Sequence, residues 1–128
     1  MPSEPEPEAA EEHLRRVRRI CGSLPDTVER VSHGEPTFFS SKKVCVMFAN
    51  NHHHDGRIAV WVAALPGEQA ELVHLSPEKY FVPPYVGKSG WIGIELDAVS
   101  DEELAIHIRN AWALVVPKKS KKQRKVKI

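Results

Sequence analysis

The sequence lacks the features that mark several large classes of protein. No stretch approaches the roughly 18 consecutive apolar residues that a membrane-spanning helix needs. The first twelve residues, MPSEPEPEAAEE, contain no apolar segment of the kind found in secretory signals. Only two cysteines occur, Cys21 and Cys45, and their spacing matches neither a CxxC motif nor a metal site. We therefore expect reduced thiols, a cytoplasmic location and no association with a membrane.

The common signatures of catalytic sites are also missing. The sequence has no glycine-rich phosphate loop, no cluster of metal-ligating residues and no nucleophile at a recognisable spacing from a base. We therefore expect no cofactor, no metal and no enzymatic activity. A chain of 128 residues corresponds to one domain and can bury a core without disulfides. We expect a monomer.

Charge of one sign is missing from each end of the chain. Residues 1–12 carry five acids and no base, and residues 117–128 carry seven bases and no acid. Of the 18 bases and 17 acids in the chain, 11 and 12 remain for residues 13–116, a net charge of −1. This distribution predicts a disordered acidic lead-in at 1–8, one folded domain at 9–116 and a disordered basic tail at 117–128. The tail is a polycation and would bind DNA or RNA non-specifically.

Hydrophobic periodicity predicts an α+β fold. Apolar residues at helical spacing favour helices at about 8–23 and 65–75, and a third helix from Ser100 to the proline at 117. Extended segments are predicted at 28–32, 37–39, 44–49, 58–63, 80–83 and 91–96. The order, written as α-β-β-β-α-β-β-α, indicates two layers, with helices packed on an antiparallel sheet.

The third helix carries the clearest local signals. Ser100 and Glu103 have the spacing of a capping box, in which each side chain bonds to the other residue's backbone N–H. An apolar face follows at spacings of three and four residues, comprising Leu104, Ile108, Ala111, Trp112 and Val115. Trp112 is therefore predicted to lie in the core.

The stretch VPPYVGKSGWIGIEL, residues 82–96, has two interpretations. Pro83 and Pro84 fix two φ angles, and the glycines allow positive φ between two extended segments, which together describe a rigid turn beside core residues. Alternatively, Tyr85 and Trp91 lie beside His33 at a groove that grips a ligand or a stacked base. The candidate groove residues are His33, Pro36, Tyr85, Gly87 and Trp91.

Two histidine-containing segments are also better explained by a structural role than by a functional one. NNHHHDGR, residues 50–57, has turn residues on both sides of the three histidines and β-rich flanks, which favours a solvated hairpin tip. Adjacent histidines on an extended chain point to alternate sides, so His52, His53 and His54 do not suit a physiological metal site. His33 could serve as an acid or base, but a histidine hydrogen-bonded at a strand break fits the sequence better.

Several segments of the sequence resemble those of the MmcQ/YjbR-like family of small bacterial proteins. These segments are SLPDTVERVSHGEPTF (23–38), FVPPYVGKSGWIGIELD (81–97) and EELAIHIRNAWALVVPKK (102–119), with lysines entering a hairpin at Lys42 and Lys43. The resemblance covers roughly residues 12–119. It implies a two-layer fold like that of secretion chaperones and DNA binding through a "double-wing" arrangement, and it brings no catalytic motif.

Two functions are therefore predicted from different classes. The first is a non-enzymatic, DNA-binding module, and the second is a protein-interaction or chaperone-like adaptor that uses the sheet face or the PPYVGxxGW groove. The candidate nucleic-acid-binding residues are Arg15, Arg19, Lys42, Lys43, Arg57, Lys118, Lys119, Lys121, Lys122, Arg124 and Lys125. Because residues 13–116 are nearly neutral, strong attraction to a polyanion is expected from the tail and not from the folded domain.

Overall fold

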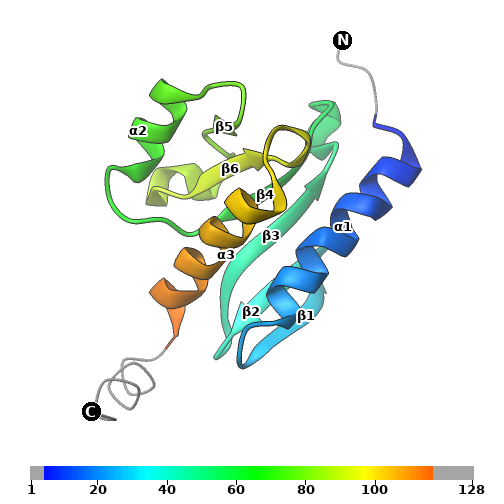
Figure 1. The fold of residues 1–128 in the computed structure, drawn as a ribbon, viewed down its shortest axis with the longest axis vertical. Helices are drawn as coiled ribbons and strands as arrows, with labels where there is room; N and C mark the ends of the chain where they lie inside the picture. The colour runs from blue at the N-terminus through cyan, green and yellow to red at the C-terminus, as the bar shows by residue number, and fades with distance from the viewer. Residues whose placement is uncertain (1–4, 117–128) are drawn as a thin grey trace.

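Six strands form one antiparallel sheet in a computed structural model that describes residues 5–116 (Figure 1). The strands are β1 (Thr27–Ser32), β2 (Glu35–Ser40), β3 (Lys43–Asn50), β4 (Ile58–Val62), β5 (Tyr80–Phe81) and β6 (Ile92–Glu95), and the helices are α1 (Pro7–Gly22), α2 (Glu68–Leu75) and α3 (Asp101–Val115). Three short 3-10 turns are η1 (His52–His54), η2 (Val86–Ser89) and η3 (Leu96–Ala98). The strand order is β1-β2-β3-β4-β6-β5, which confirms the predicted α+β class.

Tight turns divide the first half of the sheet into hairpins. The β1–β2 turn is made by His33 and Gly34, with φ of 53° and 81°, and the β2–β3 turn by Ser41 and Lys42, with φ of 52° and 71°. Positive φ at both central residues is what a two-residue type I′ hairpin requires, because that turn matches the twist of the flanking strands. The extended segments predicted at 28–32 and 37–39 therefore lie in two antiparallel strands that pair with each other.

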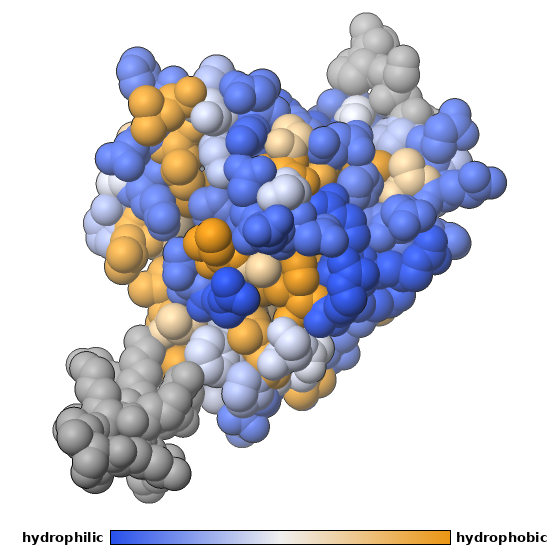
Figure 2. All heavy atoms as spheres, viewed as in Figure 1, coloured by the Kyte–Doolittle hydropathy of each residue, from blue (hydrophilic) through white to orange (hydrophobic). Residues whose placement is uncertain are grey.

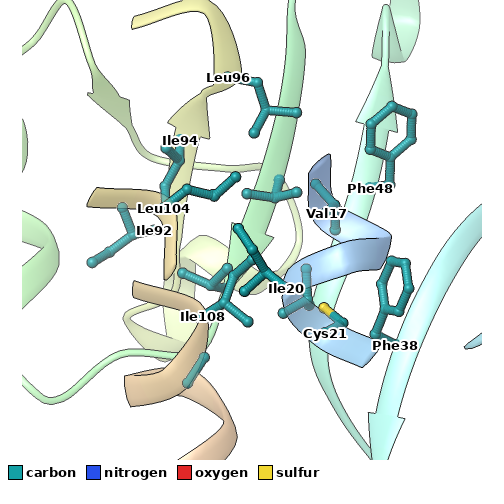
Figure 3. Packing of buried hydrophobic residues seen from close by; sticks show 14 of the residues in the cluster. Val17, Ile20, Cys21, Phe38, Phe48, Ile92, Ile94, Leu96, Leu104 and Ile108 are labelled. Atoms are coloured by element: carbon teal, nitrogen blue, oxygen red, sulfur yellow. The ribbon is translucent and has the colours of Figure 1, made fainter. Parts of the chain in front are cut away.

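The core lies between one face of the sheet and the helices α1 and α3. Alternation along the strands places Val46 opposite Val62, and Val60 opposite Ile94, on this face. Figure 3 shows Val17, Ile20 and Cys21 of α1 and Leu104 and Ile108 of α3 directed toward the labelled side chains of the sheet, Phe38, Phe48, Ile92 and Ile94. Burial of this apolar surface is the main force that holds the two layers together.

Polar contacts fix α1 against the start of α3. The guanidinium of Arg16 donates to Asp101 at 2.6 Å and to the carbonyls of Leu96 and Val99, each at 2.8 Å. This pairing lowers the pKa of Asp101, chiefly through its hydrogen bond with Arg16. The charged outer surface of α1 faces the viewer in Figure 2 as a hydrophilic band. These bonds satisfy the backbone carbonyls of Leu96 and Val99, which would otherwise need hydrogen bonds from water.

Two boundaries differ from the prediction. Helix α1 begins at Pro7, within the segment that we expected to be a disordered lead-in. Helix α2 begins at Glu68 and not at residue 65, because Gly67 has a φ of 86° and interrupts the helical backbone after Pro66.

The predicted capping box of α3 is present in both halves, with Glu103 N–H donating to Ser100 at 3.1 Å and Ser100 N–H to Glu103 at 3.0 Å. The predicted basic tail, 117–128, lies outside the described residues.

Within residues 5–116, none of the helices is both long and apolar enough to cross a bilayer.

The structure confirms that Trp112 is buried, and its Nε1 donates to the carbonyl of Pro25 at 3.0 Å. We expect Trp112→Ala to lower the free energy of unfolding by about 3–5 kcal/mol, because the substitution removes a buried ring and leaves a cavity. Urea denaturation measures this loss. Leu114→Ala, at a more exposed position of the same helix, is the control and should cost much less. Equal effects of the two substitutions would contradict the burial of Trp112.

Candidate ligand-binding groove

The sheet has a second face that α1 and α3 do not cover. Strand register places Thr37, Met47, Trp61, Gly93 and Phe81 in one row across β2, β3, β4, β6 and β5. These residues alternate with those of the core and therefore point to the opposite side. We call this side the open face. The ring of Phe81 packs directly over Gly93, where a larger residue would not fit: a Cβ on Gly93 would clash with that ring.

A groove of about 440 Å³ lies on the open face. Its apolar lining comes from β3, β4 and the segment around η2, and its polar lining from the β1–β2 hairpin and η1. The lining residues are Met47, Phe48, Ala49, Trp61, Tyr85 and Val86, together with Ser32, His33, Glu35, Thr37 and His52. Three segments far apart in the sequence thus meet over the strands: SHGEPTF (32–38), the histidine run (52–54) and PPYVG (83–87).

Three rings form an aromatic cluster in this groove. The ring centroid of His52 lies 5.0 Å from that of Trp61 and 5.7 Å from that of Tyr85, with interplanar angles of 83° and 89°. The Tyr85 hydroxyl lies 3.1 Å from Nε2 of His53, which holds the exposed Tyr85 side chain over the groove. Edge-to-face contacts of this kind are a preferred arrangement of aromatic rings. The cluster joins the β3–β4 connection to the β5–β6 connection.

Two polar atoms in the cluster are buried without a hydrogen-bond partner among residues 5–116. They are Nε1 of Trp61, a residue only 4% exposed, and Nε2 of His52. Burial lowers the pKa of His52, and the neighbouring His53 lowers it further, so the neutral imidazole is favoured. Buried polar groups are nearly always hydrogen-bonded, and leaving one unsatisfied costs about 1–3 kcal/mol. The groove therefore presents unmet hydrogen-bonding capacity in an apolar setting.

The backbone at Tyr85, and beside His52, has uncommon dihedral angles. Tyr85, with φ of 63° and ψ of −61°, is the centre of a γ-turn closed by a 2.6 Å bond from Val86 N–H to the Pro84 carbonyl. This form of γ-turn is rare and strained. His53 is left-handed, with φ of 49° and ψ of 35°. Strain of this kind persists only where the surrounding structure enforces it, and it concentrates at functional sites.

A side-chain amide and a close glycine contact hold the strained segment in place. Gln69 of α2 donates through Nε2 to the carbonyls of Gly87 and Trp91, at 2.9 and 2.6 Å. Gly87 is needed for close approach, because a Cβ there would lie 2.6 Å from Cγ1 of Val82. The rigid turn predicted for residues 82–96 is thus present, and the same turn places Tyr85 at the groove.

The structure brings together part of the predicted groove set. His33 and Tyr85 both line the groove. Pro36, Gly87 and Trp91 are not among the lining residues. Pro36 pairs with Val31 in β2, Gly87 lies against Val82, and Trp91 packs against the core. The sequence interpretation missed Trp61, which sits at the centre of the open face. Its only signal was its position in the IAVWV strand, where alternation separates it from the core residues.

The histidine run also differs from its prediction in one respect. The segment does connect β3 to β4, but the expected fully solvated tip is wrong for His52, whose ring packs edge-on against Trp61. The chain makes this possible by turning: Asn51 and His53 are left-handed, which directs His52 back over the sheet. Within residues 5–116, no three His, Cys, Asp or Glu side chains are grouped so that they could hold a metal ion.

The candidate nucleic-acid-binding residues do not form one patch. Arg19 pairs with Asp101 at 2.9 Å and Arg15 with Glu12 at 3.4 Å, both on α1, on the helix-covered side. Arg57 lies on the open face, paired with Glu95 at 2.5 Å and stacked 4.1 Å over Phe81. Lys42 and Lys43 are exposed at the β2–β3 turn. Lys118, Lys119, Lys121, Lys122, Arg124 and Lys125 lie outside the described residues.

The strain at Tyr85 leads to a prediction about stability. Tyr85→Gly and Tyr85→Ala remove the same exposed ring, but only glycine adopts positive φ without a steric cost. We expect the glycine variant to be more stable than the alanine variant by about 1–2 kcal/mol. Chemical denaturation of the two variants measures the difference. Equal stabilities would show that Tyr85 does not have a left-handed backbone in solution.

Comparisons with known proteins support both the observed fold and the family resemblance seen in the sequence. A protein of Deinococcus radiodurans, DR2400, which has a domain of the DUF419 family, has a similar structure, with a TM-score of 0.66 and 21% sequence identity. The match covers 80% of this chain and 77% of that one, and it shows a shared fold. No curated protein matches the chain. The model of the YjbR family matches residues 22–114, which is more than half of the sequence, and the chain therefore belongs to the YjbR family.

Proposed function

We propose that this chain is a non-enzymatic binding protein and that the groove on the open face is its ligand site. The observation that carries the proposal is the aromatic cluster of His52, Trp61 and Tyr85, which contains buried polar atoms without partners among residues 5–116. A concave, mostly apolar surface with a few convergent polar groups is the usual form of a binding site. A protein partner that inserts an apolar side chain would use the same groove, so the adaptor function belongs to this proposal.

The chemistry of the nucleophilic groups favours binding over catalysis. Burial raises the pKa of both thiols, that of Cys45 to about 11, which keeps them protonated and unreactive. The Thr37 hydroxyl at the groove donates to the backbone carbonyl of Glu35 at 3.1 Å and not to a base. The Tyr80 hydroxyl lies 2.9 Å from Nε2 of His107, but burial raises the pKa of Tyr80, which disfavours its anion.

The proposal predicts where small compounds bind. In 1H–15N spectra recorded with a library of charged and uncharged fragments, we expect shifts to concentrate at Met47, Ala49, Trp61 and Tyr85. Val86→Arg should weaken these complexes about tenfold or more, because it places a charge in an apolar lining. Leu75→Arg, at an exposed residue of α2 outside the groove, is the matched control and should leave binding unchanged. Fragments that bind elsewhere, or nowhere, would contradict the proposal.

DNA binding is a second candidate, and the observation that favours it is the charge of residues 117–128. That segment contains seven bases and no acid. The arginines of the folded domain are largely committed to partners, since Arg16 and Arg19 share Asp101, Arg18 pairs with Glu29, and Arg57 pairs with Glu95. Non-specific affinity for nucleic acid depends on clustered, available cations. We therefore assign the attraction to DNA to the basic segment and not to the sheet.

Salt dependence separates these two sources of DNA affinity. Engagement of all seven bases predicts a slope of log K against log salt of about −6, from roughly −0.9 for each phosphate neutralised. Replacement of these seven residues by glutamine in the full-length chain should abolish binding at physiological salt. The control replaces Arg15, Arg19, Lys42 and Lys43 by glutamine and should retain most of the affinity. If the control loses binding and the tail variant keeps it, the folded domain is the DNA-binding surface.

A further inference from the structure

We propose that the groove binds an uncharged aromatic small molecule that accepts a hydrogen bond from Nε1 of Trp61. This inference rests on the proposed function of the groove and adds the chemical class of the ligand. Four features carry it: an indole N–H without a partner among residues 5–116, a cluster of aromatic rings, the charge of the lining and the size of the groove.

The indole of Trp61 is the strongest of these features. An indole N–H can only donate a hydrogen bond, so its unmet need specifies an acceptor. Trp112 offers an internal comparison, because its equally buried ring donates to the Pro25 carbonyl at 3.0 Å. The fold thus provides a backbone acceptor for a structural tryptophan, and it provides none for Trp61 within the described chain. Once the rings that cover Nε1 shift aside, a ligand acceptor would supply the missing bond, and Nε2 of His52 offers a second polar contact in the same cluster.

The rings around Trp61 favour a flat ligand. His52, Trp61 and Tyr85 pack against one another at interplanar angles of 83°, 89° and 55°, and the exposed ring of Tyr85 is accessible at the groove. Aromatic molecules gain from edge-to-face and offset contacts with such rings beyond the burial of their surface. Met47 adds a polarisable thioether, which adapts to ring edges.

Charge and size narrow the class further. None of the lining residues that the structure describes is a lysine or arginine. Its one carboxylate, Glu35, accepts a 2.8 Å bond from the backbone of Asn50. An anionic ligand would find no counter-charge there, and the bond from Asn50 already uses part of the acceptor capacity of Glu35, so an uncharged ligand fits this lining better than a charged one. The volume of about 440 Å³ exceeds the ~150 Å³ that holds a single benzene ring, which leaves room for two fused rings.

Quinoline and naphthalene form a matched pair of probes for this inference. Both have two fused rings of nearly the same shape, and only quinoline has a ring nitrogen that accepts a hydrogen bond. Each is titrated into the full-length protein while the indole N–H signals are followed by NMR. Trp61→Phe identifies the signal of Trp61 among the three tryptophans. We expect quinoline, and not naphthalene, to move this signal downfield in a saturable manner, and to bind about 2–10-fold more tightly.

The outcomes separate this inference from the proposed function. If both probes bind at the groove with equal affinity and quinoline leaves the Trp61 N–H signal in place, the groove is a binding site but the acceptor requirement is wrong. If neither probe perturbs residues of the groove, both proposals fail. In Trp61→Phe, naphthalene should still bind, and the preference for quinoline should disappear. Should that variant not fold, sequential assignment of the wild-type spectrum identifies the Trp61 signal, and its response to the two probes decides the question.

Discussion

A sheet has two faces, and in this protein the helices α1 and α3 cover only one of them. The core between α1, α3 and the strands is closed by residues such as Val60, Ile94 and Leu104, all fully buried. The other face carries Met47, Trp61 and Phe81, which are apolar and would otherwise meet water. The connecting loops must therefore shield the apolar residues of this face from water, as α1 and α3 do on the other face. The turns around His52 and Tyr85 cover part of the open face, and the uncovered remainder is the groove.

This constraint explains why the backbone is strained where it is. The two connections turn back sharply over the sheet with positive φ at Asn51, His53 and Tyr85. Glycine at position 85 would adopt this angle at lower cost, but it would leave no ring there to cover Trp61. The sequence thus retains residues that are unfavourable for the local backbone and useful for the site. Gly87 and Gly93 show the converse, since each leaves space that a neighbouring side chain fills.

Local patterns were sufficient to predict the helices and the class of the fold. The capping box at Ser100 and Glu103 and the apolar face of α3 involve residues three or four positions apart, so the sequence displays them directly. The groove depends on register between β3, β4 and β6, which brings Met47, Trp61 and Gly93 into one row. No local spacing encodes that row. For the same reason the sequence pointed to Trp91, which is close to Tyr85 along the chain, and overlooked Trp61, which is close in space.

The groove depends on the meeting of the β3–β4 and β5–β6 connections over Trp61 on the open face. Nuclear Overhauser contacts between ring protons measure this meeting, because they report short distances between residues far apart in the sequence. We expect cross-peaks from the Trp61 ring to the ring of His52, whose centroid lies 5.0 Å away, and from His52 to Tyr85, at 5.7 Å. A folded protein in which Trp61 shows neither these contacts nor protection from solvent would contradict this arrangement.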